Sequence, residues 1–337
     1  MFAANEVVAE VDFNLPWHRY LATLYMESAR TQRADLLDPA TLASLGRIEI
    51  VARWIVDGFM TGLHRSARRG FSVEFADYRP YQPGDDLRYL DWKIAARSDR
   101  WVVRQFEEET NLRATIVLDV SRSMAWSGAA LTPRDPGSTV RLTKLAYAER
   151  LAAAVALLLL RQRDAVGLIR FDDQIRTSVP PRARRGHWRR IVNGLAEPGS
   201  GRASSGPEAL AQAARLLTRR GLIVLISDLL MEPSEIERAV RGLRAAGHDV
   251  TVLHIMDPSE RELPAGGEAL FVDPESEVEF PAHLAEVRAA YRATVEHVVA
   301  EWRRIFGGAG AGYDVVDTDS PFGVPLRRAF AARQQLP

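Results

Sequence analysis

The stretch RATIVLDVSRSMAWSGAAL, residues 113–131, decides the fold that we expect for this chain. Residues 114–119 form a continuous apolar run that ends in the carboxylate of Asp119, and the hydroxyls of Ser121 and Ser123 follow at alternate positions. A continuous apolar run of this length is typical of a strand that is buried on both faces, as in a parallel sheet. The three polar residues then lie at the carboxyl end of the strand, where open α/β sheets bind their ligands.

From residue 112 onward, apolar strands of this kind alternate with helical patterns. This alternation indicates an α/β fold: a doubly wound, mostly parallel sheet that is covered by helices on both faces. The first of the helices that follow these strands is expected at about 143–163, where apolar residues recur at helical spacing. The predicted strands are 114–119, 166–171, 221–228, 249–256, 269–273 and 313–317, and the other predicted helices are 186–195, 207–219, 234–246 and 281–306.

The chain before residue 112 has a different pattern. A helix is predicted to begin near Asp38-Pro39 and to end near Gly58 or Gly62. Residues 68–109 are rich in aromatic and turn residues, which favours irregular β structure. We therefore predict two regions, an N-terminal helical and β/turn-rich region over 1–111 and an α/β domain over 112–337.

Composition limits the classes of function. Lys plus Arg equals Asp plus Glu at 44 each, so there is no overall basic charge to attract nucleic acid or anionic lipid. The absence of cysteine excludes disulfides, thiolate nucleophiles and Cys-ligated zinc. The N-terminus does not resemble a signal peptide, and the longest apolar run, 151–160, is shorter than the ~20 residues that a membrane span needs. We expect a cytoplasmic protein with no membrane span and no bound nucleic acid.

A second carboxylate is expected at the same edge of the sheet, because the predicted strand 221–228 ends in Asp228. Asp119, Ser121 and Ser123 can direct three oxygens to one point. Hard divalent cations prefer oxygen ligands, and Mg²⁺ keeps several waters. If both carboxylates bind the ion through water, the ion stays electrophilic and takes a Glu or Asp side chain from a partner protein. The pattern predicts a Mg²⁺ site, with Mn²⁺ as the alternative metal, that serves protein binding.

The string VLDVSRSM resembles the Asp-x-Ser-x-Ser motif of the metal-ion-dependent adhesion site in von Willebrand factor type A domains. In that family a Thr on a second loop and an Asp on a third loop complete the site. Asp228 in VLISDLL matches the third-loop Asp, and the second loop corresponds to GSGRASSGPEALAQAARLL, with a serine in place of Thr. The resemblance implies a von Willebrand A-like, Rossmann-type fold and the metal ligands Asp119, Ser121, Ser123, Ser204 and Asp228, with Ser205 as the alternative to Ser204.

The similarity extends over nearly the whole chain. The segments EFADYRPYQPGDDLRYLDWKIAARSDRWVVRQFEEE, DVSRSM, GLIVLISD and DPSERELP resemble a bacterial family that is catalogued as domain of unknown function fifty-eight. Its members contain a von Willebrand A-like region and commonly accompany MoxR-type AAA+ ATPases. The resemblance therefore implies an adaptor or co-chaperone beside such an ATPase. Many relatives carry N-terminal membrane helices, and none is expected here.

Three hypotheses on function follow. The first is a non-enzymatic, Mg²⁺-dependent interaction module without catalytic residues. The second is a metal-dependent phosphotransferase or hydrolase that uses Asp119, although no His or Lys lies in its loop and no P-loop occurs. The third is a structural subunit with a vestigial metal loop.

Other titratable groups are expected to have structural roles. In the segment 83–92, PGDDLRYLDW, we expect arginine–carboxylate pairs that hold the N-terminal region on the sheet, with a second binding site as the alternative. His254 is expected to be a hydrogen-bonded core residue. Asp172 and Asp173 are expected in a solvated turn, and the basic residues of 182–190 at the start of a helix.

Overall fold

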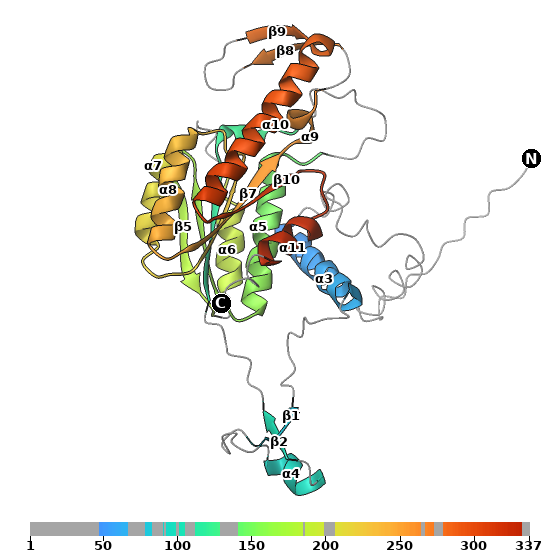
Figure 1. Cartoon of the computed structure of the whole chain (residues 1–337), viewed down its shortest axis with the longest axis vertical. Coiled ribbons are helices and arrows are strands. Elements are labelled where there is room, and N and C mark those ends of the chain that lie inside the picture. The colour runs from blue at the N-terminus through green and yellow to red at the C-terminus, as the bar shows by residue number, and fades with distance from the viewer. Residues whose placement is uncertain are drawn as a thin grey trace, which may run out of the picture.

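The centre of the protein is a six-stranded sheet with the strand order β10-β7-β6-β3-β4-β5 (Figure 1). Strand β5 pairs antiparallel with β4 at one edge, and the other pairs in the sheet are parallel. The strands are β3 (Arg113–Asp119), β4 (Ala165–Phe171), β5 (Ile175–Arg182), β6 (Leu222–Ser227), β7 (Asp249–Met256) and β10 (Gly312–Asp317). The computed structural model describes residues 47–66, 78–82, 90, 92–98, 101–104, 112–128, 141–184, 186–198, 206–263, 267–272 and 279–331.

Helices cover both faces of this sheet, and each face has its own hydrophobic core. Along β3, Ile116 and Leu118 point into one core, whereas Val117 points into the other, because side chains alternate along a strand. This arrangement confirms the predicted doubly wound, mostly parallel α/β fold. The first face carries α3 (Ile48–Ser66), α5 (Lys144–Arg161), α6 (His187–Leu195) and α11 (Gly323–Ala331), and the second carries α7 (Gly206–Leu216), α8 (Pro233–Ala245) and α10 (Leu284–Gly308).

The order of the strands creates a switch point between β3 and β6. The chain runs from β3 to β4 and β5 on one side, and then crosses to β6, β7 and β10 on the other side. In open α/β sheets, the crevice at such a switch point is the usual position of a ligand. Asp119 is the last residue of β3 and Asp228 directly follows β6, so both carboxylates lie at the switch point.

The apolar run 151–160 forms the second half of α5. Its side chains are mostly buried in the first core, against the sheet and α3. Thr143 caps the helix, because its Oγ1 accepts a hydrogen bond of 3.0 Å from the backbone N–H of Ala146. Within the residues that the structure describes, no helix is long and apolar enough to cross a membrane.

Two strands differ from the sequence-based expectation. The predicted strand 269–273 is not in the main sheet: β8 (Glu268–Val272) pairs antiparallel with β9 (Glu279–His283) in a separate ribbon at the start of α10 (Figure 1). Strand β5 was not among the predicted strands; it contains Pro180 and Pro181, which an edge strand tolerates. Gly167 on β4 permits this pairing, since a Cβ there would lie 2.8 Å from the carbonyl oxygen of Val179.

Helix α3 continues through Gly58 and Gly62, so the predicted end of the helix was wrong. Each glycine costs about 1 kcal/mol in a helix. Burial offsets this cost, because Ile55 and Phe59 lie in the same core as α5. The helix is thus packed against the α/β domain, whereas the predicted boundary at 111/112 remains a prediction.

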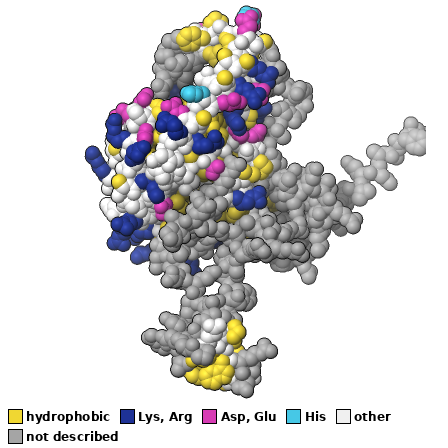
Figure 2. All heavy atoms as spheres, viewed as in Figure 1, with side chains coloured by type: hydrophobic (Ala, Val, Ile, Leu, Met, Phe, Trp, Pro, Cys, Tyr) yellow, Lys and Arg dark blue, Asp and Glu magenta, His cyan; other side chains and the backbone are white. Residues whose placement is uncertain are grey.

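The described part of 78–104 is a small aromatic unit. Strands β1 (Tyr78–Pro80) and β2 (Val102–Arg104) pair antiparallel, and α4 (Trp92–Ser98) lies between them in sequence. The ring of Trp101 lies 6.2 Å from those of both Tyr81 and Trp92. Figure 2 shows hydrophobic side chains gathered on this unit, where Trp92 is 58% exposed. Most of PGDDLRYLDW lies outside the described residues, so its predicted arginine–carboxylate pairs remain a prediction.

The packing of α3 generates the first prediction. Replacing Ile55, which is fully buried, with alanine should lower the free energy of unfolding by about 2–5 kcal/mol, because it leaves a cavity between α3 and α5. The exposed neighbour Arg53 provides the matched control, and its alanine variant should stay within about 0.5 kcal/mol. Urea denaturation measures both values. Equal, small effects would show that α3 does not belong to this core.

Candidate functional site

The loop that follows β3 brings three of the predicted oxygen ligands together. The backbone N–H of Ser121 donates to Asp119 Oδ1 at 2.9 Å, which turns the chain back toward the carboxylate. A 3-10 helix, η4 (Arg122–Ala125), begins directly after Ser121. The Oγ atoms of Ser121 and Ser123 lie 3.1 Å apart. The carboxylate and the two hydroxyls thus lie within one short loop at the carboxyl edge of the sheet.

Ser227 ties the end of β6 to this loop. Its Oγ donates a hydrogen bond of 2.7 Å to Asp119 Oδ2 and accepts one of 3.0 Å from the backbone N–H of Leu229. Leu229 has a φ of 54°, an uncommon conformation for a non-glycine residue, which reverses the chain just after Asp228. Ser227 was not among the predicted site residues. A signal existed, because Ser227 directly precedes Asp228 at the end of a strand next to β3.

Lys144, the first residue of α5, was also missed. Only 1% of its side chain is exposed, and its Nζ donates to Asp228 Oδ2 at 2.8 Å and to Glu260 Oε1 at 2.5 Å. Burial lowers the pKa of Lys144, but the charges of Asp228 and Glu260 outweigh it and raise the pKa above the ordinary value. The ammonium is therefore charged at neutral pH. A signal existed, since Lys144 is one of only two lysines among the 44 basic residues.

The loop that follows β7 holds Glu260, the other carboxylate partner of Lys144, in position. Helix α9 (Pro258–Arg261) begins with a capping box, in which Asp257 accepts from the backbone N–H of Ser259 and Glu260 Oε2 accepts from that of Asp257, each at 2.9 Å. Tyr291 on α10 donates to the carbonyl oxygen of Glu260 at 2.8 Å. Trp126, just after η4, donates through Nε1 to Ser259 Oγ at 3.4 Å, so the loop after β3 and the loop after β7 are in contact.

The charges of this cluster do not balance. Asp119 is fully buried, and its burial together with the charge of Asp228 raises the pKa of Asp119 to about 7. Asp228 is only 4% exposed, and Lys144 is the single cationic side chain that contacts it among the described residues. Two buried carboxylates that repel each other favour a further cation between them.

The donor atoms suit a hard cation. Asp119, Asp228, Ser121 and Ser123 offer oxygen only, which fits Mg²⁺ or Mn²⁺ better than a soft metal. Within the part of the chain that the structure describes, no group of three or more His, Cys, Asp or Glu side chains could hold a metal. A cation here would therefore depend on serine hydroxyls and water as well as on carboxylates. Ser204 and Ser205, the predicted second-loop ligands, lie outside the described residues.

Two structural expectations near the site had different outcomes. His254 on β7 is buried and hydrogen-bonded as expected, with Nδ1 at 2.8 Å from the hydroxyl of Tyr313, and burial lowers its pKa to about 4. The expectation of a solvated turn was wrong for Asp172. This carboxylate is fully buried and pairs with the guanidinium of Arg176 at 2.7 Å, because Arg176 on β5 reaches back over the turn.

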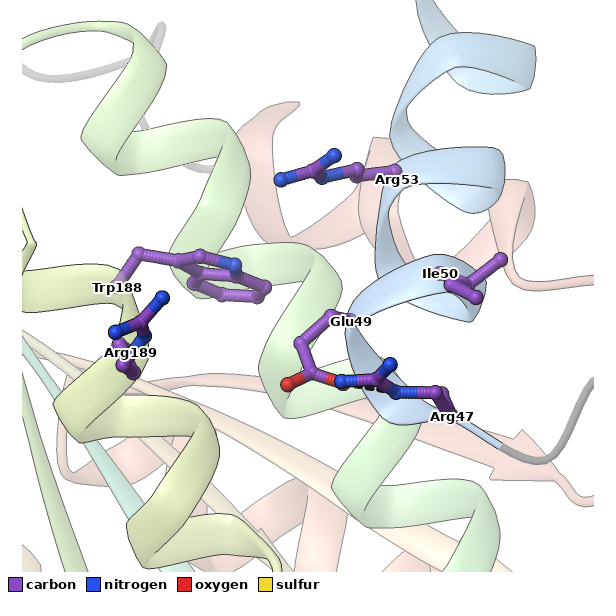
Figure 3. Close-up of a pocket in the computed structure, with 6 residues that line it drawn as sticks. All are labelled: Arg47, Glu49, Ile50, Arg53, Trp188 and Arg189. Atoms are coloured by element: carbon purple, nitrogen blue, oxygen red, sulfur yellow. Dashed lines mark ion pairs between the residues drawn. The ribbon is translucent and has the colours of Figure 1, made fainter. Parts of the chain in front are cut away.

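A separate cavity of about 300 Å³ lies between α3 and α6 (Figure 3). Helix α6 begins beside the opposite, amino-terminal end of β4, where His187 Nε2 lies 2.7 Å from the carbonyl oxygen of Val166. The cavity therefore does not belong to the switch-point cluster. It is lined by Arg47, Glu49, Ile50, Arg53, Trp188 and Arg189.

The family model described as "Protein of unknown function DUF58" matches residues 77–301, and the chain belongs to this family. It is 32% identical to the uncharacterized protein Rv1480 of Mycobacterium tuberculosis and to the uncharacterized protein Mb1516 of Mycobacterium bovis. Each match extends over 314 residues, which are 90% of this chain and 93% of the relative. The resemblance that the sequence motifs indicated is thus confirmed at the level of the family.

Similar solved structures include two proteins of Bacteroides and one domain that is named as a VWA domain. An aerotolerance-related membrane protein from Bacteroides fragilis matches at 20% identity with a TM-score of 0.45, over 65% of this chain and 99% of its own. BatB from Bacteroides thetaiotaomicron matches at 19% identity with a TM-score of 0.44, over 67% and 100%. The SpRpn10 VWA domain matches at 10% identity with a TM-score of 0.36, over 64% and 95%.

The link between the two strand ends generates the second prediction. Replacing Ser227 with alanine should lower the free energy of unfolding by about 1–3 kcal/mol, because it leaves Asp119 Oδ2 and the Leu229 N–H without their buried partner. Ser234 on α8 is exposed, so its alanine variant is the matched control and should change stability by less than about 0.5 kcal/mol. Chemical denaturation at neutral pH measures both. A neutral result for Ser227→Ala would contradict the described contact.

Proposed function

We propose that this chain is a non-enzymatic, metal-dependent protein-interaction module. In this proposal Asp119, Ser121, Ser123 and Asp228 hold a Mg²⁺ or Mn²⁺ ion, with Ser204 of the second loop as the fifth ligand. A bound ion of this kind supplies an electrophilic position to which a Glu or Asp side chain of another protein can bind. The less specific part of this proposal is that the chain is a module that binds proteins. It is supported by membership of the family and by the α/β fold.

One observation carries the proposal: the ends of β3 and β6 are joined at the switch point. The bond between Ser227 and Asp119 brings the loop of Ser121 and Ser123 to the loop of Asp228. Both carboxylates are buried at the position where a sheet of this type binds its ligand. Burial, and after it the charge of Asp228, raises the pKa of Asp119, so a cation at this position would be stabilised by both carboxylates.

The proposed partner is a MoxR-type AAA+ ATPase or one of its client proteins, with the chain as adaptor or co-chaperone. The family resemblance supports this partner, and the surface is compatible with protein binding. Basic and acidic side chains both occur over the face that carries α7, α8 and α10 (Figure 2), and the chain has equal numbers of basic and acidic residues. Recognition would then depend on the site rather than on an overall charge.

The third prediction concerns Asp119. The variant Asp119→Asn keeps an oxygen that can accept the Ser121 N–H bond but removes the charge, so Mg²⁺ binding should weaken at least about tenfold. Titration calorimetry with Mg²⁺ measures this change. Capture of partner proteins by the immobilised chain should fall in parallel, and chelation of the wild type should have the same effect.

Asp249 provides the matched control for this experiment. It lies at the opposite end of β7, where it pairs with Arg244 at 2.6 Å, far along the strand from the switch point. Asp249→Asn should therefore leave Mg²⁺ binding and capture unchanged. Capture that persists in full in the presence of chelator would contradict the proposal.

The second candidate function, a metal-dependent phosphotransferase or hydrolase that uses Asp119, is supported by one observation. Phosphoryl transfer to an aspartate needs a nearby cationic group, and Lys144 lies in the cluster although no Lys is present in the 119–123 loop. Against this function, both oxygens of Asp119 already accept hydrogen bonds, from Ser121 and Ser227, and the side chain is fully buried. A buried nucleophile with both oxygens engaged is poorly placed for attack.

The fourth prediction separates the two functions. The purified chain with Mg²⁺ should show no turnover of p-nitrophenyl phosphate or acetyl phosphate above the level of Asp119→Asn, because both oxygens of Asp119 already accept hydrogen bonds and the carboxylate is poorly placed as a nucleophile. A colorimetric phosphate assay over several hours measures this. Turnover that is lost in Asp119→Asn and retained in Asp249→Asn would favour the enzyme.

A further inference from the structure

We infer that Lys144 is a resident cation that competes with the metal for Asp228 and so keeps metal affinity low. This inference rests on the proposed function, because it concerns the regulation of the same site. The competition is between two cations for one carboxylate: the ammonium of the chain itself and a divalent ion from solution.

The contacts of Asp228 place the competition at one carboxylate. Its Oδ2 accepts the 2.8 Å bond from Lys144 Nζ, while its Oδ1 accepts a long bond of 3.4 Å from the backbone N–H of Leu230, its one partner among the described residues. The bond from Lys144 is thus the shorter of the two hydrogen bonds that this carboxylate accepts. A cation that binds through Asp228 must share its charge with the ammonium.

Lys144 is held in this position from two sides and has little freedom to leave. It lies in the first turn of α5, behind the cap of Thr143, and its backbone N–H donates to the carbonyl oxygen of Trp126 at 2.9 Å. Its Nζ also donates to Glu260, which the capping box of α9 and Tyr291 keep in place. A cation at the first turn of a helix is opposed by the helix dipole, so this lysine is retained by its two carboxylate partners.

The count of charges explains why the ammonium regulates the site rather than blocks it. Asp119, Asp228 and Glu260 supply three negative charges when ionised, and Lys144 supplies one positive charge. A divalent ion brings the cluster to neutrality, and one further carboxylate from a partner would then add a single negative charge. Because Lys144 withdraws charge from Asp228, the ion is bound less tightly by the chain and stays more attractive to the carboxylate of a partner.

Two variants with opposite expected effects test this inference. Lys144→Met keeps the length of the side chain without its charge, and should bind Mg²⁺ at least about tenfold more tightly than the wild type, because a unit charge beside a divalent ion is removed. Glu260→Gln leaves Lys144 with Asp228 as its only carboxylate partner among those described, and should bind Mg²⁺ several-fold more weakly. Titration calorimetry with Mg²⁺ alone measures the dissociation constants.

A merely structural role would not give opposite changes, since the loss of either buried partner would weaken both the fold and the metal site. Lys144→Arg keeps the charge and is the matched control, so its affinity should stay close to that of the wild type. Thermal unfolding adds a second readout: the midpoint of Lys144→Met should fall in chelator and recover on addition of Mg²⁺, whereas the wild type should change less.

The outcomes distinguish this inference from the proposed function. Tighter binding in Lys144→Met, including binding that appears only in that variant, supports the inference. Saturable binding in the wild type with equal or weaker binding in Lys144→Met overturns the inference and leaves the proposed function intact. No saturable binding in any variant overturns both. If Lys144→Met does not fold, an unchanged affinity in Glu260→Gln overturns the inference.

Discussion

The parallel pairing of β3 with β6 is the constraint on which the site depends. In this register Leu118 lies opposite Ile226, so the next residues, Asp119 and Ser227, leave the sheet side by side. Neither strand alone would place a carboxylate near the serine loop. The hydrogen bond from Ser227 to Asp119 and the buried position of Asp228 follow from that register, and so does the mutual repulsion that makes the edge receptive to cations.

The sequence was sufficient for the features that depend on local periodicity. Continuous apolar strands such as 114–119 and the apolar stripe of 143–163 indicated the parallel sheet and its covering helix, and Asp119 and Asp228 were recognised because each ends such a strand. The sequence was insufficient where tertiary packing overrides local preference. Gly58 did not end α3, because its buried neighbours pack against α5, and the prolines of β5 were tolerated at an edge.

The ion cluster shows the same limit at the level of side chains. Lys144 and Glu260 are separated by more than a hundred residues and meet only because α5 and α9 both begin at the carboxyl edge of the sheet. No short motif contains both residues. Their contact changes the electrostatics of the predicted site. The buried ammonium of Lys144 offsets part of the negative charge that would otherwise attract a metal ion.

The outer strand β5 has a consequence for self-association. Pro180 and Pro181 have no backbone N–H, so this border of the sheet offers fewer donors to a strand from a neighbouring molecule. Arg182, the last residue of β5, adds a positive charge at the end of the same edge, and like charges oppose the approach of a second β5 strand. This edge of the sheet is therefore a poor template for a strand of a second molecule, and contact between copies through β5 is disfavoured.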